Sequence, residues 1–304
     1  MNCFSQYKGS IGRRRGFTVI ELLIVMGCIA ILVSLLLPAV QQTRNTASRI
    51  ECANRLRQVA LATIMHADTQ GALPPGYTTN QPGADYPWMT WLCRILPGID
   101  QSSLWSETTG AYSDDRFPFG TQAHRGFHTP LTAFTCPMDG RVSFTAKSAE
   151  YGPVALSSYV GNGGTDYLAR DGVFSPDSKI RFADIDDGLS NTLLAGERPP
   201  SADLQYGWWY AGFGQDGHGS PDMFLGSREK NIGWSGNELC PPGPYEFQAG
   251  RTQRQCDVFH FWSLHAGGAW FARCDGSVSF LPYSANEILP ALATRSSGEV
   301  GTEQ

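Results

Sequence analysis

The residues of this sequence best suited to chemistry are its eight cysteines, because thiols can form disulfides or bind metal ions. Two of them, Cys3 and Cys28, lie before or within the first long apolar run. The other six are Cys52, Cys93, Cys136, Cys240, Cys256 and Cys274. In an oxidising compartment an even number of cysteines favours disulfides, and six cysteines allow 15 pairings. The zinc alternative is weak because the sequence lacks a Cys-x-x-Cys pair.

A second candidate is the pair His265 and Asp275, which a turn and a strand could bring together for catalysis or metal binding. The structural alternative makes Gly267-Gly268 and Asp275-Gly276 two turns of a meander, with His265 capping one of them. Asp-Gly favours a tight type I′ turn, so residues 269–281 are expected to form a hairpin around Asp275 and Gly276. We favour the structural interpretation.

A third candidate is a calcium loop that begins at Asp184, Asp186 and Asp187. The EF-hand pattern places Gly at its sixth position and Glu at its twelfth. Here the glycine comes fifth and the twelfth residue is Ala195. The segment therefore favours a turn, and calcium is only a weak alternative; we expect no cofactor.

Two further patterns bear on enzyme and ligand-binding functions. Residues 233–237, Gly-Trp-Ser-Gly-Asn, lack the last glycine of the Gly-x-Ser-x-Gly nucleophile elbow. The aromatic residues Trp208, Trp209, Tyr210 and Trp234 could form a stacking platform for sugars, but burial in a core explains them more simply. We therefore predict that the protein is not an enzyme.

The first element that positions these residues is an apolar run of 21 residues, 17–37. As a helix it is about 31 Å long, which matches the roughly 30 Å hydrocarbon core of a membrane. Fourteen of its residues are Leu, Ile, Val or Phe, and their combined transfer energy exceeds the cost of Glu21, about 3 kcal/mol at most. The alternatives are a plain signal anchor and a secretory signal peptide, but for the latter residues 36–40 do not form the small-x-small cleavage site.

Residues 13–23 read Arg-Arg-Arg-Gly-Phe-Thr-Val-Ile-Glu-Leu-Leu. This segment resembles the prepilin-type leader of bacterial type IV pilins and type II secretion pseudopilins. The resemblance implies that a prepilin peptidase removes residues 1–16, cleaving between Gly16 and Phe17, and N-methylates Phe17. It also implies that Glu21 pairs with the terminal amine of a neighbouring subunit during assembly. The N-terminus would be cytoplasmic, the helix would span the inner membrane, and the head would be periplasmic or at the cell surface.

The helix is expected to continue beyond the membrane through residues 38–70, with a bend near Pro38. An apolar stripe at helical spacing should pack on the head: Ala53, Leu56, Val59, Ala60, Thr63, Ile64 and Ala67. Gly71 and the following Leu-Pro-Pro-Gly segment end the helix. A Cys52–Cys136 disulfide, which would tie this helix to the head, is a hypothesis among the 15 pairings.

Residues 71–304 are rich in turn signals and predict a β-rich, loop-rich head. Three stretches, 51–61, 182–197 and 265–276, together with Phe134-x-Cys136-Pro137, resemble a large bacterial family. It is a domain of unknown function that follows prepilin-type leaders and ends in His-x9-Asp-Gly. The predicted fold class is α+β: a long kinked N-terminal helix on an antiparallel, pilin-like head.

Composition and charge exclude several function classes. Hydrophobic residues make up 41% of the 304, too many for a disordered chain. The net charge is −5, made of +4 in residues 1–16 and −9 after them, so the head is a poor nucleic-acid binder. We predict a prepilin-like structural subunit whose partners are a prepilin peptidase, other pilin-like subunits through the helix, and inner-membrane lipid. The rival is a membrane-anchored extracytoplasmic solute- or carbohydrate-binding protein that does not polymerise.

Overall fold

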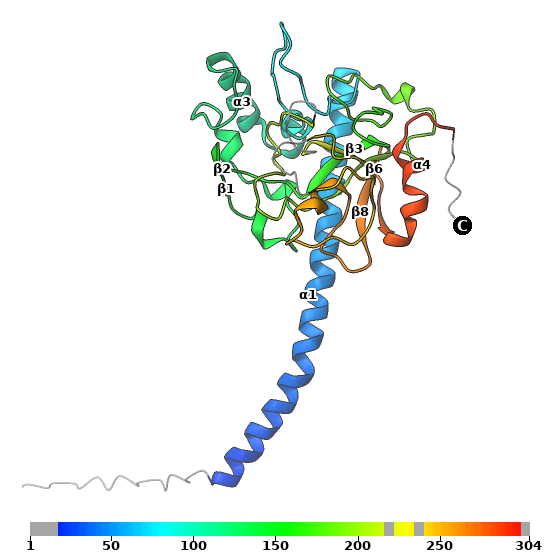
Figure 1. Cartoon of the computed structure of the whole chain (residues 1–304). Helices are drawn as coiled ribbons and strands as arrows, with labels where there is room; N and C mark the ends of the chain where they lie inside the picture. The colour runs from blue at the N-terminus through cyan, green and yellow to red at the C-terminus, as the bar shows by residue number, and fades with distance from the viewer. Residues whose placement is uncertain (1–17, 216–221, 234–239, 299–304) are drawn as a thin grey trace, which may run out of the picture. The chain divides into compact units, whose positions relative to one another are not determined.

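The computed structural model describes residues 18–215, 222–233 and 240–298. The chain divides into two compact units, Met1–Ala47 and Ser48–Gln304, and each is described by itself. The division falls inside the first helix, α1, which runs from Val19 to Gln70 and contains Pro38 (Figure 1). The bend expected at Pro38 stays a prediction.

The first unit consists, where it is described, of the beginning of α1. All of its described residues are exposed, including long apolar side chains such as Leu23, Ile31 and Leu36. By length and composition, α1 is the one helix among the described residues that could cross a membrane. The helix begins with a local cap, because Thr18 and Glu21 have the Thr-x-x-Glu spacing of a capping box.

The second unit takes in the rest of α1, which carries a buried stripe. The buried residues are Cys52, Leu56, Val59, Ala60, Ala62, Thr63 and Ala67. This confirms five of the seven predicted positions, whereas Ala53 and Ile64 lie at the margin and are half-buried. The helix ends at Gln70, and Gly71 follows with a positive φ of 79°, as the stop signal predicts.

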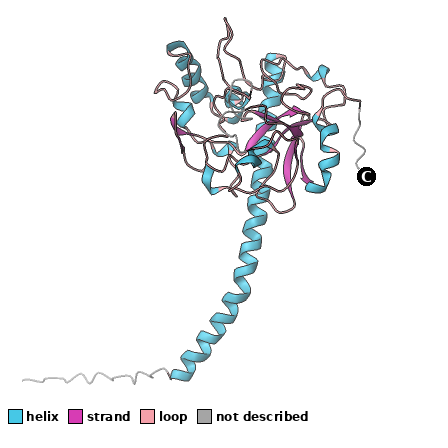
Figure 2. Cartoon of the chain, in the orientation of Figure 1, coloured by secondary structure: helices cyan, strands magenta, loops and turns pink. Residues whose placement is uncertain are grey.

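A five-stranded sheet forms the centre of the head (Figure 2). Its strands, in spatial order, are β5 (Phe224–Gly226), β3 (Tyr159–Gly164), β4 (Leu193–Glu197), β8 (Gly268–Arg273) and β9 (Val278–Pro282). All neighbouring pairs are antiparallel except β3 and β5, which are parallel. The predicted hairpin is confirmed, since Ala269 pairs with Leu281 and Ala272 with Val278 around the Asp275-Gly276 turn.

Alternating side chains of this sheet enter two different cores, as a strand's period of two requires. Tyr159 joins the large core that contains Leu56 of α1, whereas Val160 and Phe271 join a smaller core on the other face with Leu289. The helix α4 (Leu289–Ala293) supplies this second core. The head is therefore a layered α+β fold, which confirms the predicted class.

The remaining elements are short and surround the sheet. The helices are α2 (Trp91–Arg94) and α3 (Ser102–Asp114), and the two small hairpins pair β1 (Ala146–Ser148) with β2 (Gly152–Val154) and β6 (Arg228–Glu229) with β7 (Tyr245–Glu246). Single 3-10 turns are η1 (Leu96–Ile99), η2 (Arg125–His128), η3 (Thr132–Phe134), η4 (Gly140–Val142), η5 (Phe182–Asp184), η6 (Gln255–Phe259) and η7 (Tyr283–Glu287).

Candidate functional site

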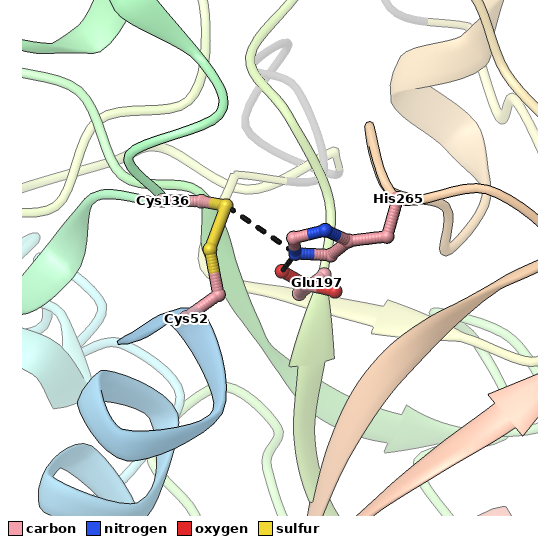
Figure 3. A group of neighbouring side chains, drawn as sticks. All are labelled: Cys52, Cys136, Glu197 and His265. Carbon is pink, nitrogen blue, oxygen red and sulfur yellow. Dashed lines mark hydrogen bonds and ion pairs between the residues drawn. A yellow bond between two sulfur atoms is a disulfide. The ribbon is translucent and has the colours of Figure 1, made fainter. Parts of the chain in front are cut away.

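Four side chains with chemical potential meet inside the head (Figure 3). They come from α1, from the loop after η3, from the end of β4 and from the loop before β8, and they are Cys52, Cys136, Glu197 and His265. Each offers a sulfur, nitrogen or oxygen atom, and these atoms all lie within 4.8 Å of one another. All four residues are buried. We call this group the Cys–His–Glu cluster.

The sulfur atoms of the cluster are joined, because Cys52 and Cys136 form a disulfide across 84 residues of sequence. This is the pairing hypothesised from the sequence, and it fastens α1 to the head. Cys52 belongs to the buried stripe of α1. The backbone N–H of Cys136 donates to Ser158 Oγ at 2.9 Å, and Ser158 precedes β3 directly.

The imidazole of His265 lies between the disulfide and the carboxylate of Glu197. Its Nε2 atom is 3.2 Å from Glu197 Oε1 and 3.6 Å from Cys136 Sγ. The other carboxylate oxygen, Glu197 Oε2, accepts a hydrogen bond of 2.8 Å from the backbone N–H of Trp270. A buried carboxylate needs such partners, since an unpaired buried charge is costly. The arrangement places an imidazole and a carboxylate directly beside a sulfur atom.

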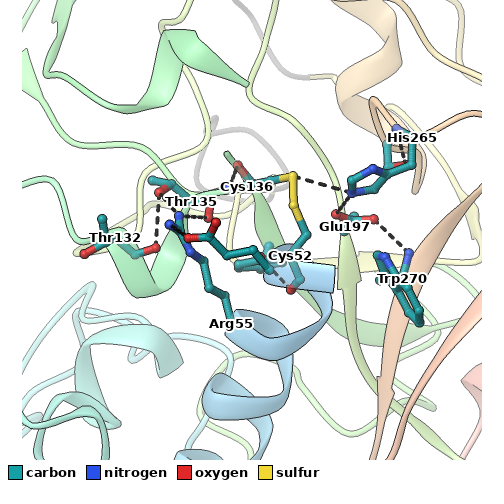
Figure 4. Close-up of a disulfide and its surroundings, with 12 residues drawn as sticks. Cys52, Arg55, Thr132, Thr135, Cys136, Glu197, His265 and Trp270 are labelled. Atoms are coloured by element: carbon teal, nitrogen blue, oxygen red, sulfur yellow. Dashed lines mark hydrogen bonds and ion pairs between the residues drawn. A yellow bond between two sulfur atoms is a disulfide. The ribbon is translucent and has the colours of Figure 1, made fainter. Parts of the chain in front are cut away.

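The other side of the disulfide is held by a guanidinium group (Figure 4). Arg55 Nη1 donates to the carbonyl oxygen of Thr135 at 2.8 Å and to its hydroxyl at 3.2 Å. Arg55 also forms an ion pair with Glu51, one turn earlier on α1. The residue next to Cys136 is thus bound to the same helix as Cys52, so α1 is anchored here by both covalent and polar contacts.

Two models of known protein families match the chain. A family model described as "Protein of unknown function (DUF1559)" matches residues 41–287, which is most of the chain. The chain belongs to this DUF1559 family. A second model, the prokaryotic N-terminal methylation motif, matches residues 11–37 and supports a prepilin-type leader and a pilin-like subunit. No curated protein and no solved structure matches the chain.

The His-x9-Asp-Gly ending of this DUF1559 chain does not form a His–Asp pair. His265 faces Glu197, whereas the carboxylate of Asp275 accepts a hydrogen bond of 2.8 Å from Ser277 N–H inside the β8–β9 turn. Gly276 has a φ of 83°, which suits glycine in that turn. Asp275 and Gly276 are thus turn residues, as favoured, but His265 belongs to the cluster and does not cap a turn.

The other cysteines of the DUF1559 chain divide into two kinds. Cys240 and Cys256 form a second disulfide with a sequence separation of 16. Cys93 and Cys274 are buried free thiols, so the expectation that all six cysteines are disulfide candidates is wrong for these two. Burial raises the pKa of both thiols well above the usual range, which keeps them protonated and unreactive.

The weak calcium alternative is not supported, because internal partners occupy two of its three carboxylates. Asp184 pairs with Arg181, whose guanidinium lowers the pKa of this carboxyl to about 2. Asp187 accepts hydrogen bonds from the backbone N–H groups of Ser297 at 2.9 Å and Gly298 at 2.8 Å. These contacts explain the acidic segment as a set of turn and capping residues, and Asp186 alone does not make a site.

The proposed assembly residue Glu21 caps the start of α1. Its carboxylate accepts hydrogen bonds from Thr18, 2.9 Å from the backbone nitrogen and 2.7 Å from the hydroxyl. The cleavage-site residues Gly16 and Phe17 lie outside the described residues. Thr18 and Glu21 therefore keep each other's polar groups paired within a single chain.

The stacking platform for sugars, which the sequence offered as an alternative, is not formed by those of its residues that the structure describes. Trp208, Trp209 and Tyr210 are buried in the large core of the head. Trp234 and most of the near-elbow segment 233–237 lie outside the described residues.

Sequence reasoning missed the Cys–His–Glu cluster because its members are far apart in the chain. A search for local metal-ligand spacing finds pairs a few residues apart, whereas these four residues come from four separate segments. A signal was nevertheless present. Each member lies in one of the stretches that carry the family resemblance: Cys52 in 51–61, Cys136 in 134–137, Glu197 in 182–197 and His265 in 265–276.

Proposed function

We propose that this chain is a prepilin-like structural subunit that is anchored in the inner membrane and assembles through its N-terminal helix. A prepilin peptidase cleaves it between Gly16 and Phe17 and methylates the new amino group of Phe17. The helix then spans the membrane with its N-terminus cytoplasmic and the head periplasmic or at the cell surface. The helix joins those of other subunits in a pilus or a type II secretion pseudopilus.

The observation that carries this proposal is the exposure of all the apolar residues described at the start of α1. Leu23 and Leu35 are 69% and 67% exposed, and residues on every side of the helix share this exposure. Soluble monomers rarely expose a continuous apolar surface of this size. Lipid tails or neighbouring apolar helices are the surroundings that such a surface fits.

The single acid in this apolar segment fits the same proposal. A carboxylate inside a membrane is costly and by default marks a function, with a partner of opposite charge. Glu21 is exposed, and among the described residues its carboxylate accepts hydrogen bonds from Thr18. The amino group of a neighbouring Phe17 is the proposed partner, and it would exchange places with Thr18 during assembly.

Cys28 allows assembly to be measured in membranes, because it is exposed on the same part of α1. The full chain is produced with a prepilin peptidase, and a thiol-specific bifunctional reagent is added to the membranes. The proposal expects a mature chain that begins at N-methyl-Phe17 and a cross-linked dimer that Cys28→Ser abolishes, because the one exposed thiol among the described residues of each chain can be linked to one neighbour. Glu21→Ala should remove the dimer, whereas Glu107→Ala, an exposed acid of the head, should leave it unchanged. An uncleaved chain, or a dimer that survives Glu21→Ala, would contradict the proposal.

A pocket in the head favours a second candidate function, solute or carbohydrate binding by an anchored protein that does not polymerise. Its volume is about 490 Å³, and His66, Asp85, Tyr86, Arg94 and Trp105 are among its lining residues. The size fits a small ligand, and aromatic rings beside a guanidinium suit an anionic sugar or similar polar solute.

The binding candidate is tested by thermal melting of the chain with a panel of neutral and acidic sugars. A ligand that raises Tm in the wild type and not in a Trp105→Ala variant would support it. Assembly is measured separately by the Cys28 cross-linked dimer. Binding without any cross-linked dimer would make the anchored binding protein the better description.

A further inference from the structure

We propose that the reduced chain binds one zinc ion at the Cys–His–Glu cluster, and that the zinc ion and the Cys52–Cys136 disulfide exclude each other. This goes beyond the proposed structural function, because it assigns a metal site to the interior of the head. The observation behind it is that four potential ligand atoms converge within 4.8 Å of one another.

The geometry of the cluster is close to that of a tetrahedral zinc site. With Zn–N bonds of about 2.0–2.1 Å and Zn–S bonds of about 2.3 Å, neighbouring ligand atoms lie roughly 3.4–3.8 Å apart. His265 Nε2 already lies 3.6 Å from Cys136 Sγ and 3.2 Å from Glu197 Oε1. The main change required is that the two sulfur atoms separate once the bond between them is absent.

The donor set is chemically suited to zinc. Two thiolates and an imidazole are ligands that Zn²⁺ prefers, and a carboxylate oxygen can complete four-coordination. The hard cations Ca²⁺ and Mg²⁺ take oxygen ligands and would not be held by sulfur. All four ligand residues are buried, so the site is closed to water and resembles a structural site more than a catalytic one.

The supporting contacts of the ligands are already in place. Glu197 Oε2 is fixed by Trp270 N–H, which leaves Oε1 directed at the cluster. The backbone N–H of His265 donates to Ser263 Oγ at 3.0 Å, and that hydroxyl donates in turn to Gly268 O at 2.7 Å. Such outer contacts orient metal ligands and raise their affinity.

The two states exclude each other because the same sulfur atoms serve both. In a disulfide the sulfurs are covalently bonded and carry no thiolate charge, so they cannot ligate zinc as thiolates do. Closing the disulfide by exchange with an external disulfide breaks that S–S bond into two thiolates. The two cysteine thiolates lose two electrons and form their own S–S bond, and the site loses both sulfur ligands. The zinc-binding form is therefore the dithiol form that precedes disulfide closure.

Cobalt(II) is the probe, since thiolate-bound tetrahedral cobalt has characteristic visible and charge-transfer bands. The full-length chain in detergent, free of metal and oxygen, is reduced and titrated with Co²⁺ and then with Zn²⁺. The expected result is one equivalent of cobalt per chain with thiolate bands, which zinc displaces and which oxidised glutathione abolishes. The oxidised chain should show no such bands. A reduced chain without these bands, or an oxidised chain that binds cobalt equally, would overturn the proposal.

Variants identify the ligands. Cys52→Ser with Cys136→Ser should remove the bands, whereas Cys240→Ser with Cys256→Ser is the matched control and should retain them. Glu197→Gln and His265→Gln should weaken binding by at least the roughly 10–100-fold that loss of a supporting contact causes. Both single variants are first oxidised, and formation of the Cys52–Cys136 disulfide shows that α1 is seated in the head. Unchanged cobalt affinity in variants that pass this check would also overturn the proposal.

Discussion

The two parts of α1 are one continuous helix in two different settings. In residues 19–47 apolar side chains point in every direction and are exposed, as in Leu32 at 59%. In residues 48–70 a single stripe is buried, with Leu56 at 0%, and the other faces remain exposed or half-buried. The same backbone geometry thus supports two hydrophobic patterns, each fitted to different surroundings.

This difference shows how each part of the helix removes its apolar side chains from water. The second part gains free energy by removing its stripe from water within its own chain. Among the described residues of its own unit the first part has no such partner, and on the proposed function it gains this free energy from lipid or from other helices. Changes in the second part should therefore alter the folding of the head, while changes in the first part should alter only membrane retention and assembly.

The largest expected effect tests the covalent link between α1 and the head. Replacing Cys52 and Cys136 by Ser should lower the free energy of unfolding by about 4–5 kcal/mol, since the bond spans 84 residues. Replacing Cys240 and Cys256 should cost less, about 3 kcal/mol, since that bond spans 16. Urea unfolding of the detergent-solubilised chain, followed by tryptophan fluorescence, measures both values. A greater loss from the second pair would contradict the expectation.

A matched pair of leucines tests the comparison directly. Leu56→Ala should lower the free energy of unfolding of the head by about 2–5 kcal/mol, because it opens a cavity in the large core. Leu32→Ala is the control and should leave the unfolding transition of the head unchanged, because that side chain is exposed. If both variants lowered the stability of the head equally, the first part of α1 would have a partner within the chain.

The sequence predicted α1 well because its signals are local. The apolar run, the stripe from Leu56 to Ala67 and the stop at Gly71 depend on residues a few positions apart. The Asp275-Gly276 hairpin followed from local turn chemistry for the same reason. Elements of this kind can be predicted without any knowledge of the tertiary fold.

The interior of the head could not be predicted in the same way. The even number of cysteines indicated disulfides, but a count does not tell which sulfur atoms lie close together in the fold. The count therefore wrongly included Cys93 and Cys274. The partner of His265 proved to be Glu197, which is 68 residues earlier and reaches it because β4 and β8 are neighbours. Only the order of the strands determines such a contact.

The stability of the head should depend on pH, because Glu229 is a fully buried acid of the head. Burial raises its pKa to about 7, although backbone N–H groups such as that of Gly226 counteract this. The folded state therefore holds a proton that the unfolded state releases near pH 4.5, and stability should fall as pH rises between these values. The slope should be at most about 1.4 kcal/mol per pH unit. Urea unfolding at several pH values measures it, and Glu229→Gln should flatten this slope; an unchanged slope would assign it to another group.

The smallest expected effect lies where α1 enters the head. The guanidinium carbon of Arg49 is 3.7 Å from the ring centre of Phe280 and 5.7 Å from that of Trp270. A cation over an aromatic face at an accessible site contributes about 0.5–1 kcal/mol, so Arg49→Gln should lower the free energy of unfolding by that amount. Arg44→Gln removes the same charge one and a half turns earlier, where the helix is fully exposed, and should have no effect. Equal effects would mean that both arginines act through overall charge. A difference between them would place the change from membrane helix to head helix between residues 44 and 49.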